Sequence, residues 1–131
     1  MSKNRWIQVG AFCCLIGVAC GAFAAHQLAN VLSAADLDIF KKGVYYNFIH
    51  ALAIILTTLI SFHFGTKAIR MANVLFLVGI IFFSGSLLLI STISLTHFQI
   101  PTAIYLITPA GGICFMLGWI LLIVGVSRRS N

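Results

Sequence analysis

Acidic residues are almost absent from this sequence. Its 131 residues include eight Lys and Arg but two acids, Asp36 and Asp38. Charged residues make up 8% of the chain, whereas a soluble domain carries roughly 25%. With 61% hydrophobic residues, too few polar side chains remain to cover a soluble enzyme. The composition also excludes a disordered or nucleic-acid-binding tail. We therefore expect an integral membrane protein, surrounded by membrane lipid and binding no nucleic acid.

The shortage of acids also limits the chemistry that the chain can perform. A Ser-His-acid triad needs an acid beside a histidine, but both acids lie in one short segment. The glycine-rich stretches lack the Gly-Lys-Ser or Gly-Lys-Thr of a phosphate-binding loop. No two cysteines form a Cys-x-x-Cys pair. We therefore expect no enzyme: no catalytic residues, no bound cofactor and no metal ion.

Long stretches without Asp, Glu, Lys or Arg predict where the chain crosses the membrane. They cover residues 6–35, 43–66 and 71–127. A helical crossing takes about 20 apolar residues, so the third stretch is long enough for two crossings. We place its turn at residues 96–101, where Pro101 can open the next helix. The sequence predicts an all-α fold, a single domain formed by a compact bundle of four transmembrane helices. These helices cover about 6–27, 43–64, 71–95 and 102–126.

A cleavable signal peptide is the alternative to the first span. Lys3 and Arg5 precede its apolar run, and Ala22-Phe23-Ala24 has the small residues of a cleavage site. Cleavage would leave three spans, and we favour the uncleaved helix.

The basic residues predict the orientation of the chain. On one side of four spans lie the N-terminus, the 65–70 loop and the C-terminus, and this side is rich in Lys and Arg. The other side carries Lys41 and Lys42, offset by the two acids. Since cytoplasmic loops carry the excess of Lys and Arg, we expect both termini in the cytoplasm of a bacterial plasma membrane. The basic residues occur in pairs along the sequence, which argues against a polybasic lipid-binding segment. Those on the cytoplasmic side are Lys3, Arg5, Lys67, Arg70, Arg128 and Arg129.

The segment before the second span predicts a short helix on the membrane surface. Ser33 and Asp36 have the spacing of a capping box, so a helix should begin near Ala34. Leu37 and Phe40 then share one apolar face, which leaves the acids and lysines in water. We expect an interfacial helix over about 34–42.

Small residues recur at regular steps in three of the spans. Such residues at helical spacing let two backbones approach closely. We expect these seams to serve packing inside the bundle, and they would serve contacts in a homo-oligomer or larger membrane complex equally well. The seams are Cys13, Gly17, Gly21 and Ala25, then Ala72, Gly79 and Ser86, then Gly111, Gly118 and Gly125.

Polar residues inside the spans form the candidate functional site. Such residues are costly in hydrocarbon and face a bundle interior or a cavity. Tyr46 and His50 are four residues apart and share one helix face. Pro109 cannot donate to the carbonyl of Tyr105, which then needs another partner. The candidate polar cluster comprises His26, Tyr46, Asn47, His50, Ser84, Ser86, Thr108 and Pro109.

Several interpretations of this cluster stay open. In one, its hydrogen bonds fix the register of the helices. In another, it forms a pocket on the outer side for a small solute or ion, as in a transporter or channel component. A haem held by His26 and His50, or a quinone, is a third possibility that rests on few residues.

An ordered series of short motifs runs through the same residues. It closely resembles the YgdD-like family of small inner-membrane proteins, a domain of unknown function that is similar to transmembrane protein 256. The chain departs from the family at Ala24, where Gly is usual, at Asn47, where Gln is common, and at Leu88, where Tyr is frequent. The resemblance implies a four-helix bacterial plasma-membrane protein and implies no activity. The motifs are Gly21–His26, Gly43–Ala53, Phe83–Leu87, Ile107–Gly112 and Gly118-Trp119.

From these features we expect a non-enzymatic accessory protein that supports the cell envelope or a larger membrane complex. Its soluble loops are very short, its spans carry close-packing seams, and no catalytic set is recognisable. The alternative is a transporter or channel component that uses the polar cluster.

Overall fold

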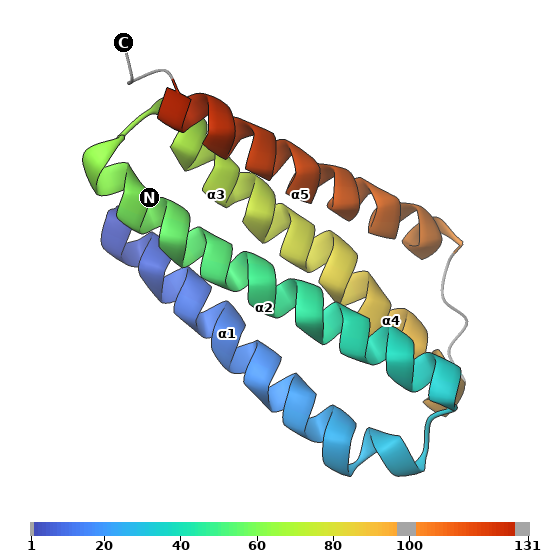
Figure 1. The fold of residues 1–131 in the computed structure, drawn as a ribbon. Coiled ribbons are helices and arrows are strands. Elements are labelled where there is room, and N and C mark those ends of the chain that lie inside the picture. The colour runs from blue at the N-terminus through green and yellow to red at the C-terminus, as the bar shows by residue number, and fades with distance from the viewer. Residues whose placement is uncertain (1, 97–101, 128–131) are drawn as a thin grey trace.

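Four long apolar helices make up the computed structural model, which describes residues 2–96 and 102–127 (Figure 1). Each is long and apolar enough to cross a membrane, so the predicted all-α, four-span fold is confirmed. The predicted turn at 96–101 and the C-terminal arginines lie almost wholly outside the described residues. The elements are α1 (Lys3–His26), η1 (Leu28–Asn30), α2 (Ala34–His63), α3 (Lys67–Gly79), η2 (Ile80–Ser84), α4 (Gly85–Thr92), η3 (Ile93–Leu95) and α5 (Ala103–Ser127).

Side-chain caps begin three of the spans. The hydroxyl groups of Ser2, Ser33 and Thr66 each accept a hydrogen bond from the backbone N–H three residues later. Each cap satisfies one N–H that the start of a helix leaves without a partner. Ser33 therefore begins α2 at the predicted place, but the helix does not end after two turns. Residues 34–42 are the first turns of one 30-residue helix rather than a separate interfacial helix.

The helix continues through Gly43, and this glycine is a packing position. Gly43 is buried, and a Cβ added to it would lie 3.2 Å from the carbonyl oxygen of Ser84. The missing side chain therefore lets α2 approach the third span, which consists of α3, η2, α4 and η3, without interrupting the helix.

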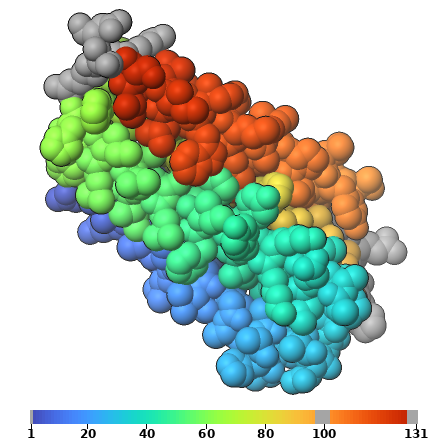
Figure 2. All heavy atoms as spheres, viewed as in Figure 1, coloured from blue at the N-terminus to red at the C-terminus, as the bar shows by residue number. Residues whose placement is uncertain are grey.

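The four spans pack on one another in chain order. α1 lies along α2, α2 along the third span, and the third span along α5 (Figure 1). Within the described residues the backbones of α2 and α5 barely approach each other. Atoms of the third span are visible between them in Figure 2.

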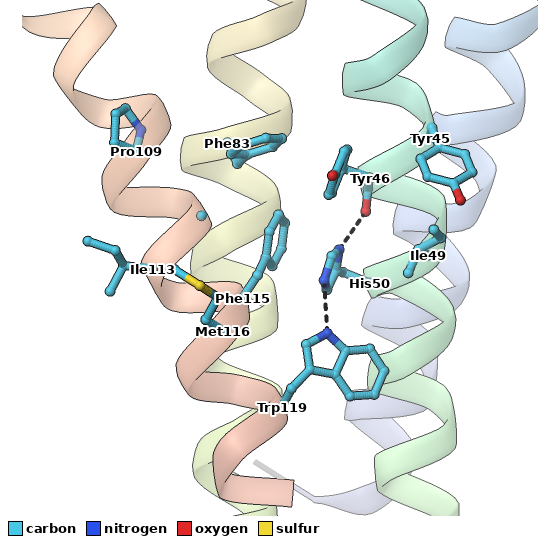
Figure 3. A pocket seen from close by; sticks show the side chains of 11 residues that line it. Tyr45, Tyr46, Ile49, His50, Phe83, Pro109, Ile113, Phe115, Met116 and Trp119 are labelled. Atoms are coloured by element: carbon cyan, nitrogen blue, oxygen red, sulfur yellow. Dashed lines mark hydrogen bonds between the residues drawn. The ribbon is translucent and has the colours of Figure 1, made fainter.

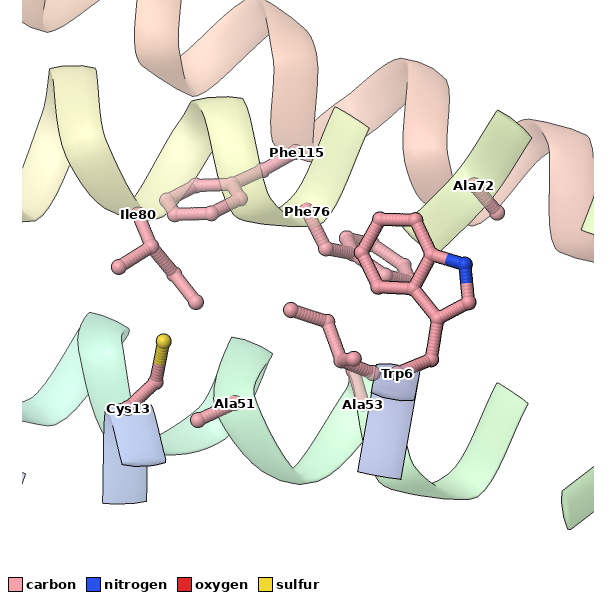
Figure 4. Packing of buried hydrophobic residues seen from close by; sticks show 9 residues of the cluster. Trp6, Cys13, Ala51, Ala53, Ala72, Phe76, Ile80 and Phe115 are labelled. Carbon is pink, nitrogen blue, oxygen red and sulfur yellow. The ribbon is translucent and has the colours of Figure 1, made fainter. Parts of the chain in front are cut away.

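The core draws buried side chains from every span. Trp6 and Cys13 of α1 meet side chains of α2, and Phe115 reaches in from α5 (Figure 4). Phe76 and Ile54 are fully buried. Since lipid is as apolar as these side chains, close packing rather than escape from water holds them together.

A close backbone contact joins α5 to the third span. A Cβ added to Gly111 would lie 2.4 Å from the backbone nitrogen of Phe83, so only hydrogen fits there. The seam predicted on α5 is thus a contact within the chain. The fit recurs in steps of seven residues, at Gly118 against the ring of Phe76 and at Gly125 against Ile69, each 2.6 Å from an added Cβ.

Replacing Gly111 by Ala should destabilise the fold, because the new methyl group would overlap the backbone of η2. Overpacking of this kind costs about 1–3 kcal/mol, so the thermal unfolding midpoint in detergent should fall. Gly112→Ala is the control, because a Cβ there would make an ordinary 3.6 Å contact with the Phe83 ring. Equal midpoints for the two variants would show that the close approach does not hold α5 in place.

Candidate functional site

α2 separates the members of the predicted polar cluster. Tyr46, His50 and Pro109 line a hollow between α2 and α5 (Figure 3). Asn47 and Ser84 line a second hollow, which is bordered by α1, α2 and the third span. Successive residues of a helix point about 100° apart, so Tyr46 and Asn47 face different sides of α2. The eight residues therefore do not form a single pocket.

Ser86 and Thr108 form a direct link between α4 and α5. Their hydroxyl oxygens are 2.6 Å apart, and the Ser86 hydroxyl also donates to the carbonyl of Phe83 at 2.9 Å. Because a hydroxyl carries one hydrogen, Thr108 must be the donor in the pair. Both hydroxyls are therefore occupied in joining helices.

Asn47 plays the same part between α1 and α2. Its side-chain nitrogen donates to the carbonyl of Cys13 at 2.9 Å, and the residue is buried. Gly17 makes room for this side chain, since a Cβ there would lie 2.7 Å from the Asn47 nitrogen.

His26 lies far from the other predicted site residues. It is the exposed last residue of α1, and its carbonyl accepts a hydrogen bond from the Asn30 side chain at 3.1 Å. At the level of His50, α1 presents residues near Cys13, as the bond from Asn47 shows. From Cys13 to His26 the helix rises roughly 20 Å, by 1.5 Å per residue. The two histidines therefore do not face one haem iron, and that interpretation was wrong.

The hollow between α2 and α5 is larger than the hollow that Asn47 and Ser84 line. Its volume is about 700 Å³. Aromatic side chains make up much of its wall, and Figure 3 shows Tyr46, Phe115 and Trp119 between the two helices. It is lined by Tyr45, Tyr46, Ile49, His50, Phe83, Pro109, Gly112, Ile113, Phe115, Met116 and Trp119.

His50 is the polar centre of this hollow, and both of its ring nitrogens are hydrogen-bonded. Nδ1 lies 2.9 Å from the carbonyl oxygen of Tyr46, and the indole N–H of Trp119 donates to Nε2 at 3.2 Å. A carbonyl can only accept and an indole N–H can only donate. His50 is therefore the neutral tautomer with its proton on Nδ1. Phe115 stacks on the imidazole, with ring centroids 3.4 Å apart.

Sequence reasoning missed two polar contacts. Trp119, the partner of His50, was noted within a motif but not as a hydrogen-bond donor. Asn73 of α3 was not singled out, although an amide in an apolar stretch was a visible signal. It is buried, donates to the Thr58 hydroxyl at 2.9 Å and is hydrogen-bonded by Thr57. These bonds join α2 to α3 near the loop at residues 64–66, which connects the two helices.

Comparison with known proteins identifies the family. A family model described as a protein of unknown function, DUF423, matches residues 20–112. The chain belongs to this family. The range matched by the DUF423 model includes every member of the predicted polar cluster, whereas Phe115 and Trp119 lie beyond it.

Relatives of this DUF423 chain are named as membrane proteins. A UPF0382 membrane protein of Staphylococcus haemolyticus is 39% identical over 94% of this chain and 95% of its own length. YwdK of Bacillus subtilis is 33% identical over 94% of this chain and 96% of its own. The inner membrane protein YgdD of Escherichia coli is 32% identical over 98% and 93%. The predicted resemblance to the YgdD-like family is confirmed, and the chain is a membrane protein. No solved structure matches it.

Removing the indole N–H should weaken the fold by the value of one hydrogen bond between helices. We expect Trp119→Phe to lower the unfolding free energy through two effects, the lost packing and the lost hydrogen bond. The hydrogen bond should account for about 0.6 kcal/mol and for at most about 1.7 kcal/mol. The measurement is a denaturation titration in mixed micelles. It compares the unaltered chain, Trp119→Phe, His50→Phe and the double variant. An equal cost of Trp119→Phe in either background would show that the bond to His50 contributes nothing.

Proposed function

We propose that this DUF423 chain is a non-enzymatic accessory protein that holds a small lipophilic molecule in the hollow between α2 and α5. The single observation that carries the proposal is the hollow itself. Its 700 Å³ falls in the range of roughly 300–1,000 Å³ that small-molecule sites occupy. It opens sideways between two spans, so its ligand would enter from the bilayer.

The walls of the hollow indicate the chemistry of the ligand. Tyr46 and Phe83 lie 4.8 Å apart by ring centroids, and Phe115 and Trp119 continue the aromatic wall. Aromatic faces and edges favour a planar ring as the occupant. Tyr45 and Tyr46 lie at the other end from Trp119 (Figure 3) and bring phenolic O–H groups. A lipophilic ring compound that carries an acceptor oxygen suits this combination.

The hydrogen bonds favour binding over catalysis or transport. Both nitrogens of His50 are occupied, so the imidazole does not stand ready as a base. Ser86 and Thr108 bind each other, and Asn47 binds the backbone of α1. Polar groups that would line a solute pathway instead join the helices, which supports the accessory role.

Charge supports a cytoplasmic position for both termini in a bacterial plasma membrane. The starts of α1 and α3 and the end of α5 lie at one end of the molecule (Figure 1). Lys3, Arg5, Lys67 and Arg70 belong to this end, whereas both acids lie near the start of α2. Under the positive-inside rule the basic end faces the cytoplasm.

Reporter fusions test this orientation. Green fluorescent protein fused to the C-terminus should fluoresce, and alkaline phosphatase fused there should be inactive, because the phosphatase needs an oxidising compartment for its disulfides. A phosphatase fused after Asn30 should be active. The reverse pattern would contradict the proposed orientation.

Native mass spectrometry of the chain, extracted gently from its own membrane, tests the binding function. The spectrum should show a bound small molecule whose mass is not that of a phospholipid. Gly112→Leu should remove most of it, because the added side chain enters the hollow that Gly112 lines. Ala110→Leu is the control, since Ala110 is exposed on the same helix and outside the lining. Phospholipid masses alone, in equal amounts in both variants, would contradict the proposal.

A further inference from the structure

Two basic side chains that are distant in the sequence meet at one pocket. Lys3 of α1 and Arg70 of α3 line a pocket of about 220 Å³ at the end of the molecule where both helices begin. Buried polar residues form its inner wall. The pairwise spacing of basic residues along the sequence therefore understates how they gather in the fold. The other lining residues are Trp6, Thr58, Ser61, Gly65 and Asn73.

The Lys3 ammonium group is fixed at the wall of this pocket. Its Nζ donates to the carbonyl of Ser61 at 3.0 Å and lies 4.2 Å from the centre of the Phe62 ring. An ammonium group has three N–H donors. The bond to Ser61 uses one of them, so others remain for an anion in the pocket.

No acidic side chain of the protein can neutralise these cations. The two acids of the sequence are Asp36 and Asp38, and Asp38 already pairs with Lys42 at 2.7 Å. From Asp36 to Ser61 the helix rises roughly 38 Å, several times the Debye length of about 8 Å at physiological salt. No acidic side chain therefore supplies the counter-charge for Lys3 and Arg70.

The place of the pocket identifies the anion. It lies where α1 and α3 begin and α2 ends, which is the level at which a spanning helix leaves the hydrocarbon. Trp6 lines it, and tryptophan is enriched at the level of the headgroups. A guanidinium group binds phosphate oxygens in a fork. We propose that this pocket binds the phosphate of an anionic phospholipid headgroup, held between Lys3 and Arg70.

Competition between two lipids tests the proposal on the full chain. The purified protein is offered equal amounts of phosphatidylglycerol and phosphatidylcholine with identical acyl chains, and bound lipid is measured by native mass spectrometry. Phosphatidylglycerol should be preferred. Arg70→Gln should reduce that preference about fivefold, the factor expected for one basic residue near an anionic surface. Arg70→Lys should restore part of it.

Lys67→Gln is the matched control, because Lys67 is an exposed cation one turn earlier on α3 and outside the pocket. It should leave the preference unchanged. An equal loss in Lys67→Gln and Arg70→Gln, or equal binding of both lipids by the unaltered chain, would overturn the proposal. Binding of inorganic phosphate by the lipid-free chain, together with no preference between the two lipids, would also overturn it, in favour of a free phosphate ligand.

The outcome of this test depends neither on a variant that misfolds nor on the proposed function. The lipid comparison on the unaltered chain needs no variant, so a variant that fails to fold does not prevent a decision. The pocket shares no lining residue with the hollow between α2 and α5, so either proposal can fail while the other stands.

Discussion

The close approach of α5 to the third span is the contact on which the rest of the structure depends. At Gly111 the two backbones leave no room for a methyl group, and the same fit recurs every seven residues along the seam. A seven-residue repeat keeps one face of each helix against the other over several turns. Phe115 completes the contact from the other side, against Gly79. No hydrophobic effect drives helices together inside a membrane, so the close packing of these two spans is what holds them together.

Because α5 is held against the third span, it stands away from α2. The gap is crossed by side chains alone: Phe115 stacks on His50, and Trp119 donates to it. An imidazole in hydrocarbon must have its polar atoms satisfied. Trp119 satisfies Nε2 across the gap, and the Tyr46 carbonyl satisfies Nδ1 within α2, while open space remains beside them. The hollow is thus a consequence of packing, and its polar centre is stable without a ligand. The proposed ligand site would therefore be preformed, as small-molecule sites usually are.

The spans and the α5 seam could be predicted from the sequence because they rest on hydropathy and on one repeat. The polar cluster could be predicted only in part. Tyr46, His50 and Pro109 do share a hollow, and Ser86 does meet Thr108, but Asn47 and Ser84 line a second hollow, which α1 also borders. Depth along a helix can be counted in residues, whereas the side that a residue faces depends on which helices are neighbours. The sequence does not say which helices are neighbours, so the hydrogen bond from Trp119 to His50 was not predicted.

The π-helical segment η2 shows how one irregularity serves several surfaces. A π turn holds more residues than an α turn and turns the following side chains relative to the preceding ones. Here the backbone of Phe83 contacts Gly111, and the ring of Phe83 lines the hollow between α2 and α5. The next residue, Ser84, lines the second hollow, which α1 borders. The Ser84 hydroxyl is buried and, among the described residues, has no hydrogen-bond partner. The segment that secures α5 therefore also shapes both hollows, which couples their form to the packing of the bundle.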